Sequence, residues 1–156
     1  MSAKEQFLKK LHSRNVPQER FNNRAQADIA AFRQAMMQLQ DNVGEWLEGT
    51  GIESRTFTVS LVELLTSEGA FSIYGMTLHY ENKVIKFTPA FLYGQGVTGC
   101  VDVILVVGGQ ISDICRLFMR SAESAGWTYM RLSNFSGQRS TFDEEAFFAV
   151  ISPLAA

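Results

Sequence analysis

The sequence predicts an α+β domain in which N-terminal helices, one of them long, pack on an antiparallel meander sheet of about five to six strands. A short helix is expected to end the chain. Three observations lead to this prediction. Apolar residues recur every three or four positions near the N-terminus, the period changes to two after Gly51, and a helix-capping pattern appears near residue 141.

The size and composition of the chain favour a single domain. It has 156 residues, of which 46% are hydrophobic, and this is enough apolar material for one core. We therefore expect one domain over residues 1–156, with residues 1–14 as a basic arm or a short helix.

The long helix is predicted from one apolar stripe. Its members are spaced by four and three positions in turn: Ala25, Ile29, Phe32, Met36, Leu39, Val43 and Trp46. We expect a short helix over residues 2–12 and a start of the long helix at residues 15–17, because Pro17 suits a first helical turn. Gly49 and Gly51 should end it. The spacing also suits a coiled-coil seam, but the flanks lack regular opposite charges, which favours a helix lying across a sheet.

The strands are predicted from alternation and from turn residues. Residues 57–61 alternate apolar and polar side chains, as a half-buried strand does. In the next strand the apolar parity changes at Gly75, which indicates a β-bulge. Residues 81–83 and Gly108-Gly109 are expected to be tight turns. Residues 111–125 fit either a helix or one arm of a hairpin, and the hairpin is favoured because it continues the meander.

The C-terminal helix is predicted from a capping box. Thr141 is expected as the N-cap, with Glu144 three residues later reaching back to it. A short helix that carries Phe147 and Phe148 should follow until Pro153.

Gly94, Gly96 and Gly99 form a G-x-G-x-x-G pattern. In a dinucleotide-binding fold this loop follows a strand and opens a helix whose N-terminus holds the pyrophosphate. Here it opens a β-rich segment, so we interpret it as a turn and a bulge and expect no nucleotide cofactor.

Residues able to carry catalysis or hold a metal are few and isolated. His12 and His79 have no ligand or partner at helical spacing, and Cys100 lies in an apolar strand. Asp102 and Glu63 could form a carboxylate pair only if the sheet brought them together. We therefore expect a non-enzymatic protein without cofactor or metal.

The compartment is inferred from the cysteines and the N-terminus. Cys100 and Cys115 are the only cysteines and make no disulfide framework. The basic start is followed by no apolar run of the kind that a signal peptide or a membrane span needs. We expect a cytoplasmic protein with reduced thiols and no membrane association.

The charge is distributed unevenly. Residues 1–35 carry seven basic and three acidic residues, a net charge of +4, so the remainder carries −6. Between Asp41 and Glu68, six carboxylates face only Arg55. This stretch is either a solvated surface or a binding surface for a basic protein, with Trp46 as an apolar anchor. The candidate partner-binding residues are Asp41, Glu45, Trp46, Glu48, Glu53, Glu63 and Glu68. A nucleic-acid partner is not expected, because such binders are basic over a whole face.

The second half of the chain carries a family resemblance. A strand that ends in Pro89 is followed by the glycine-rich turn of residues 93–99 and by a Gly-x-Val-Asp strand around Asp102; Trp127 and the helix of residues 142–151 come later. This pattern resembles small bacterial immunity proteins of polymorphic-toxin and type VI secretion loci, although Cys100 stands where a basic residue is expected. The resemblance implies a cytoplasmic protein that binds and blocks a toxin, and no catalytic residues carry over.

Two other classes remain open. A secretion chaperone or adaptor would have an exposed apolar groove and form a stable homodimer. A small enzyme would bring titratable groups together in a pocket. The sequence does not decide between a monomer and a homodimer.

Overall fold

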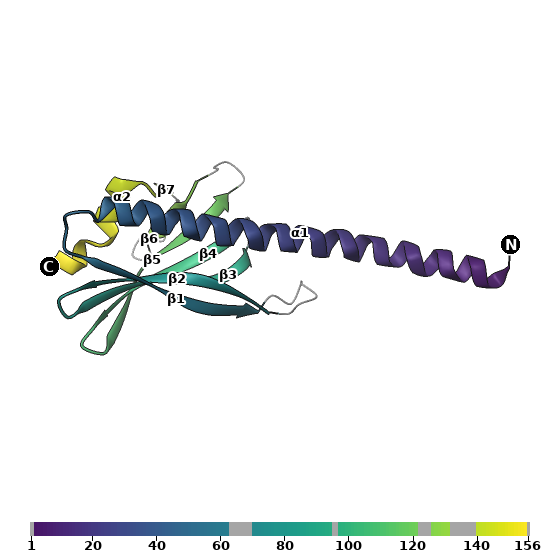
Figure 1. Ribbon diagram of the computed structural model, residues 1–156, viewed down its shortest axis with the longest axis horizontal. Coiled ribbons are helices and arrows are strands. Elements are labelled where there is room, and N and C mark those ends of the chain that lie inside the picture. The colour runs from purple at the N-terminus through teal and green to yellow at the C-terminus, as the bar shows by residue number, and fades with distance from the viewer. Residues whose placement is uncertain (1, 63–69, 95–96, 122–125, 132–139, 156) are drawn as a thin grey trace.

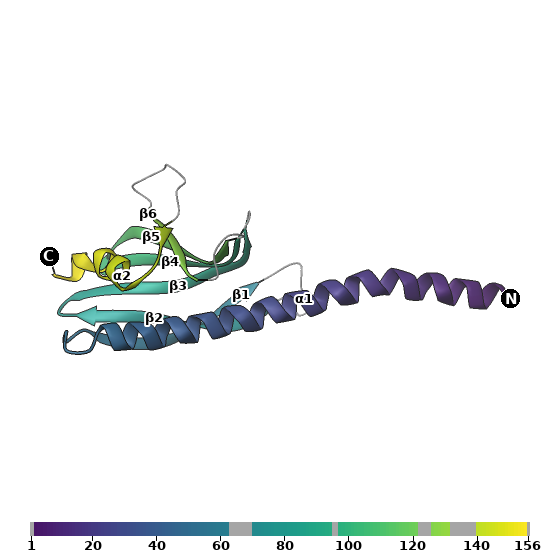
Figure 2. The same cartoon turned by 90° about the horizontal axis from the view of Figure 1, so that it is seen from above.

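The computed structural model describes residues 2–62, 70–94, 97–121, 126–131 and 140–155. The C-terminal part of a long helix, α1 (Ala3–Trp46), lies along a twisted antiparallel sheet, and its N-terminal part projects well beyond the edge of that sheet (Figures 1 and 2). A short helix, α2 (Glu144–Val150), and a 3₁₀ turn, η1 (Ser152–Ala155), follow the sheet. The predicted α+β class is therefore confirmed.

The sheet is a simple meander. In the described part of the chain it has seven strands in the order β1-β2-β3-β4-β5-β6-β7, one or two more than predicted. The strands are β1 (Glu53–Val62), β2 (Ala70–Tyr80), β3 (Lys83–Gly94), β4 (Val97–Val107), β5 (Gln110–Ser121), β6 (Thr128–Arg131) and β7 (Ser140–Thr141). Each strand pairs with the next one along the chain, so every connection is local.

The prediction of two separate N-terminal helices is wrong. α1 begins after Ser2, whose hydroxyl accepts a hydrogen bond from the Glu5 amide at 3.2 Å, and it continues through Pro17. An interior proline costs one backbone hydrogen bond and crowds the carbonyl four residues before it, but its φ is helical, and α1 runs on past Pro17. The predicted end is confirmed, because α1 stops at Trp46 and Gly49 and Gly51 take φ values of +79° and +76°.

The apolar stripe of α1 is the centre of the core. Phe32, Met36, Leu39 and Val43 are fully or almost fully buried against the sheet. The same core contains Phe147 from α2, so both helices cover one continuous apolar cluster. The hydrophobic effect of this shared burial is the main force that holds α1 on the sheet.

Polar contacts fix the position of α1 along the strands. The Arg33 guanidinium donates to the Ser72 carbonyl at 2.9 Å and lies 6.0 Å from the centre of the Phe71 ring. The Tyr93 hydroxyl donates to the Asp28 carboxylate at 2.6 Å. These contacts tie the helix to β2 on one side and to β3 on the other.

The predicted β-bulge at Gly75 is wrong. The β1–β2 register runs without a shift through the pair Phe57–Gly75. The pairing of β2 with β3 begins at the next residue, Met76, opposite Phe87. A side chain at Gly75 would lie 2.6 Å from the Phe57 ring and 2.7 Å from the Phe87 carbonyl oxygen, so only glycine fits between them. Register shifts instead occur in β3 between Pro89 and Phe91 and in β4 between Val103 and Ile104.

The structure resolves the ambiguity of residues 111–125 in favour of a hairpin. The segment lies largely in β5, which pairs with β6; residues 122–125 lie outside the described residues. Gly108 and Gly109, with φ of +58° and +81°, form the preceding tight turn between β4 and β5.

The predicted capping box at Thr141 is also wrong. Thr141 is paired with Thr128 in β7, so its backbone belongs to the sheet. Asp143 is the N-cap of α2, and its carboxylate accepts a hydrogen bond from the Ala146 amide at 2.9 Å. The tertiary pairing of β7 with β6 moves the helix start two residues downstream.

Replacing Asp143 with alanine is expected to lower the free energy of unfolding by about 1 kcal/mol, because the Ala146 amide loses its capping partner. Thr141→Ala, at an exposed position, is the control and should change it by less than about 0.5 kcal/mol. Urea unfolding of the two variants measures the difference. A larger loss at Thr141 than at Asp143 would contradict the observed cap.

Candidate functional site

A cleft of about 500 Å³ lies between α1 and the far end of the sheet. On one side it is lined by α1, and on the other by β5 and by the segments around Trp127 and Phe142. Its lining residues are Ala31, Gln34, Ala35, Gln38, Leu39, Asn42, Trp46, Met119, Gly126, Trp127 and Phe142. The cleft exists because α1 lies over the earlier strands of the meander and leaves this edge partly open.

Two kinds of side chain determine what the cleft can bind. Gln34, Gln38 and Asn42 follow one another at intervals of four along α1 and present neutral amides. Trp46 and Trp127 are half-buried and offer aromatic surface. Among the residues that the structure describes, those lining the cleft include no ionisable side chain. The cleft can therefore hold apolar and hydrogen-bonding groups, but these residues provide no acid–base pair.

Trp46 is held in place by the C-terminal helix. Its ring centre lies 5.2 Å from that of Phe147, with the two ring planes tilted by 39°. Phe147 also makes an edge contact with Phe142 at 6.3 Å. This aromatic cluster gives the closed end of the cleft a rigid wall.

Three of the predicted partner-binding residues form an exposed row at the C-terminal end of α1 and in the turn that follows it. Asp41, Glu45 and Glu48, called the acidic row below, are spaced by four and three positions and are all exposed. Gln38 and Asn42 lie three positions before Asp41 and Glu45, so the row follows the rim of the cleft. The structure thus brings these acids next to the cleft that Trp46 lines.

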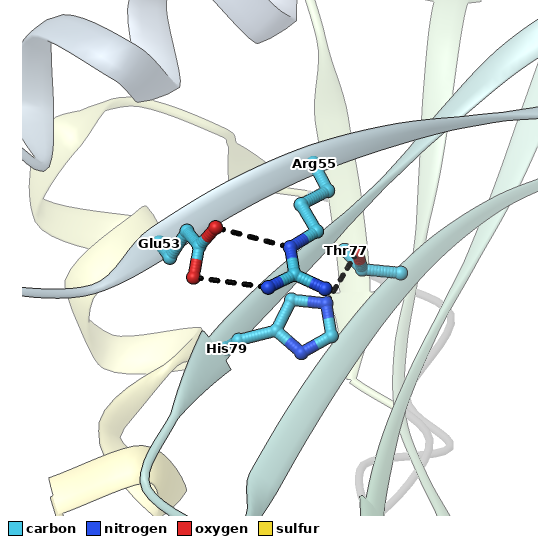
Figure 3. Close-up of polar contacts among 4 residues, drawn as sticks. All are labelled: Glu53, Arg55, Thr77 and His79. Atoms are coloured by element: carbon cyan, nitrogen blue, oxygen red, sulfur yellow. Dashed lines mark hydrogen bonds and ion pairs between the residues drawn. The ribbon is translucent and has the colours of Figure 1, made fainter.

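Glu53 lies apart from the acidic row, at the start of β1 (Figure 3). Both of its carboxylate oxygens accept hydrogen bonds from Arg55, at 3.1 and 3.2 Å. This hydrogen bonding, followed by the positive charge of Arg55, lowers the pKa of Glu53 below its ordinary value. Its charge is already paired locally. Glu63 and Glu68 lie outside the described residues.

The neighbouring His79 belongs to the same polar group on the β1–β2 hairpin. Its Nε2 atom lies 2.9 Å from the Thr77 hydroxyl oxygen, and the strand register places it opposite Glu53 (Figure 3). Glu53 and Arg55 on β1 and Thr77 and His79 on β2 thus form two hydrogen-bonded pairs on neighbouring strands.

The glycine-rich pattern serves the packing of the fold. It joins β3 to β4 as an antiparallel pair, in which Tyr93 lies opposite Thr98, and no helix follows it. Gly99 takes a φ of +82° and lies against Phe32 of α1. Residues 95 and 96, where the turn is predicted, lie outside the described residues, and the register shift of β3 falls before the pattern, between Pro89 and Phe91.

Asp102 and Cys115 also have structural surroundings. The Asp102 carboxylate accepts a hydrogen bond from Arg116, opposite it on β5, at 2.8 Å. Burial raises the pKa of the Cys115 thiol to about 12, so it stays protonated at neutral pH and is a poor nucleophile. Its contribution to stability is complete below the ordinary thiol pKa of about 8.5 and is lost as the pH rises towards that of the folded state.

Comparison with known protein families, with curated proteins and with solved structures returned no match. In the part of the chain that the structure describes, no group of three metal-ligating side chains is gathered. No helix among the described residues is both long enough and apolar enough to cross a membrane.

The sequence prediction included Trp46 but missed the rest of the cleft. The amide stripe of Gln34, Gln38 and Asn42 was a usable signal, because its members share one helical face beside the acids. Met119, Trp127 and Phe142 could not be assigned to the same site from sequence, since their meeting depends on the β5–β6 pairing and on the position of α2.

Proposed function

We propose that this protein is a non-enzymatic binding protein that neutralises a basic partner, as an immunity protein neutralises its cognate toxin. The observation that supports the proposal is the acidic row on the rim of an aromatic cleft. The carboxylates would attract the partner, and the tryptophans of the cleft would anchor one of its apolar side chains. The resemblance of the second half of the chain to immunity proteins agrees with this role.

Replacing Asp41, Glu45 and Glu48 with lysine is expected to lower the association rate constant for a toxin encoded by a neighbouring gene by about 10-fold to 100-fold. The residues are exposed, so the fold should survive, and the salt dependence of the association rate should become flatter. Stopped-flow or surface-binding kinetics at two salt concentrations measure both effects.

A matched pair of single variants separates a local effect from one of net charge. Glu45→Lys and Asp113→Lys change the charge of the molecule equally, and both residues are exposed, but Asp113 lies on β5 beyond the acidic row. We expect only Glu45→Lys to slow association. Equal rates for both variants and for the parent would rule out the acidic row as the binding surface.

A secretion chaperone or adaptor is the second candidate. It is favoured by Phe7 and Leu8, which are 61% and 52% exposed on the projecting part of α1. Co-expression distinguishes the two classes. An immunity protein abolishes the toxicity of its partner, whereas a chaperone raises the yield and export of its effector without blocking activity.

A further inference from the structure

The N-terminal part of α1 has an apolar surface that the sheet does not cover. We call residues 3–25 the arm; at 1.5 Å per residue it is roughly 35 Å long. Residues 3–9 are all exposed, and Ile29 is the first buried residue among the side chains of α1 that the structure describes. Figures 1 and 2 show the arm extending away from the sheet.

A helix in this position needs a partner to be stable. Most of the stability of helices in proteins comes from packing of an apolar face, and an interior proline such as Pro17 weakens an isolated helix further. Phe7 and Leu8 supply apolar surface for such packing.

The charges of α1 point to a second copy of the chain as that partner. The arm carries six basic and two acidic residues, a net charge of +4. Residues 26–48 carry four acidic residues and one arginine, a net charge of −3. Asp28 accepts from Tyr93, and the exposed Arg33 keeps its positive charge while it donates to the Ser72 carbonyl, so the three carboxylates of the acidic row leave this segment negative. The net charges of the arm and of residues 26–48 are therefore opposite. Two copies of the segment placed antiparallel would set the basic part of each beside the acidic part of the other.

We propose that two copies of this protein form a two-fold symmetric dimer in which the arm of each copy lies antiparallel along the acidic row of the other. A register that sets Lys9 level with Asp41 sets Lys4 beside Glu45, and its centre falls at residue 25, where the arm ends. The interface is isologous, because each copy gives one arm and receives one.

The same register gives the apolar residues of the arm a place to bind. Leu8 comes level with Asn42, which lines the cleft together with Trp46, and Phe7 comes level with the buried Val43. The register thus sets basic and apolar positions of the arm level with the acidic row and with one end of the cleft lining. The acidic row would be covered in the dimer, so a second copy and the basic partner proposed above compete for it.

Charge reversal tests the dimer with the purified chain alone. One variant carries Lys4→Glu and Lys9→Glu, and the other carries Asp41→Lys and Glu45→Lys; all four residues are exposed. We expect the unmodified chain to sediment as a dimer and to dissociate more readily in high salt. The dissociation constant of the dimer should rise about 100-fold for each variant alone, because every contact between arm and acidic row occurs twice in a two-fold symmetric dimer.

An equimolar mixture of the two variants is the decisive measurement. In the mixed dimer the reversed positions of one arm meet the reversed positions of the partner's row, and the unchanged arm meets the unchanged row. Opposite charges are then level again at every one of these positions, so association should return. Circular dichroism checks that both variants remain folded. A monomeric unmodified chain, variants that dimerise as well as the parent, or a mixture that stays monomeric would each overturn the proposal. None of these outcomes bears on toxin binding, which is measured separately with the partner present.

Discussion

Replacing Phe32 with alanine is expected to lower the free energy of unfolding by about 3–5 kcal/mol. Phe32 has no exposed surface and lies at the middle of the apolar stripe of α1. Its ring packs against the backbone at Gly99, so truncation leaves a cavity between the helix and the sheet that neither element can close without moving. Urea unfolding of the variant and the parent measures the loss.

Met37→Ala is the matched control for this variant. Met37 lies on the same helix, slightly more than one turn later, but its side chain is 58% exposed. Its truncation should change the free energy of unfolding by less than about 0.5 kcal/mol. If Phe32→Ala also stayed within that limit, the apolar stripe would not form the core.

The features predicted well from sequence are those set by local chemistry. The spacing of Phe32, Met36 and Leu39 indicates one buried helical face, and this face is the one that packs on the sheet. Gly108-Gly109 permits the positive φ values that a tight hairpin turn needs. Such signals depend on neighbouring residues only, so no knowledge of the rest of the fold is required to interpret them.

The wrong predictions concern positions where tertiary contacts override a local preference. Thr141 has a good capping sequence, but β7 pairs with β6 through it and Asp143 takes the cap. Gly75 looks like a bulge, but it is required by the close approach of Phe57 and of the Phe87 carbonyl. In each case the deciding contact comes from another part of the chain.

The residues of the candidate site also divide into those that a local sequence pattern identifies and those that only tertiary contacts bring together. Asp41, Glu45 and Glu48 can be grouped from sequence because they follow one another at intervals of four and three, at the end of one helix and in the turn after it. Glu53 is close to them along the chain, but the turn after α1 places it on β1 beside Arg55. Trp127 joins the cleft only through the pairing of β5 with β6, a long-range contact that no local pattern encodes.

Replacing Gly99 with alanine is the second substitution from which we expect a large effect, a loss of about 2–5 kcal/mol in the free energy of unfolding. Two separate causes contribute. The φ of +82° is one that residues with a Cβ rarely adopt, which accounts for about 1–2 kcal/mol. A Cβ at this position would also lie 2.9 Å from the Cβ of Met119 and 3.1 Å from the Phe32 ring, and such overpacking costs about 1–3 kcal/mol.

Gly49→Ala separates these two causes. Gly49 has nearly the same φ, +79°, but a Cβ there would meet no atom within 4 Å. It should therefore show the backbone cost alone, and the difference between the two variants, about 1–3 kcal/mol, measures the crowding of the added Cβ by Met119 of β5 and Phe32 of α1. Combining Gly99→Ala with Phe32→Ala should cost less than the sum of the single changes, because one of the two clashing groups is gone. Equal losses for Gly99→Ala and Gly49→Ala, measured by urea unfolding, would mean that neither Met119 nor Phe32 lies close to Gly99.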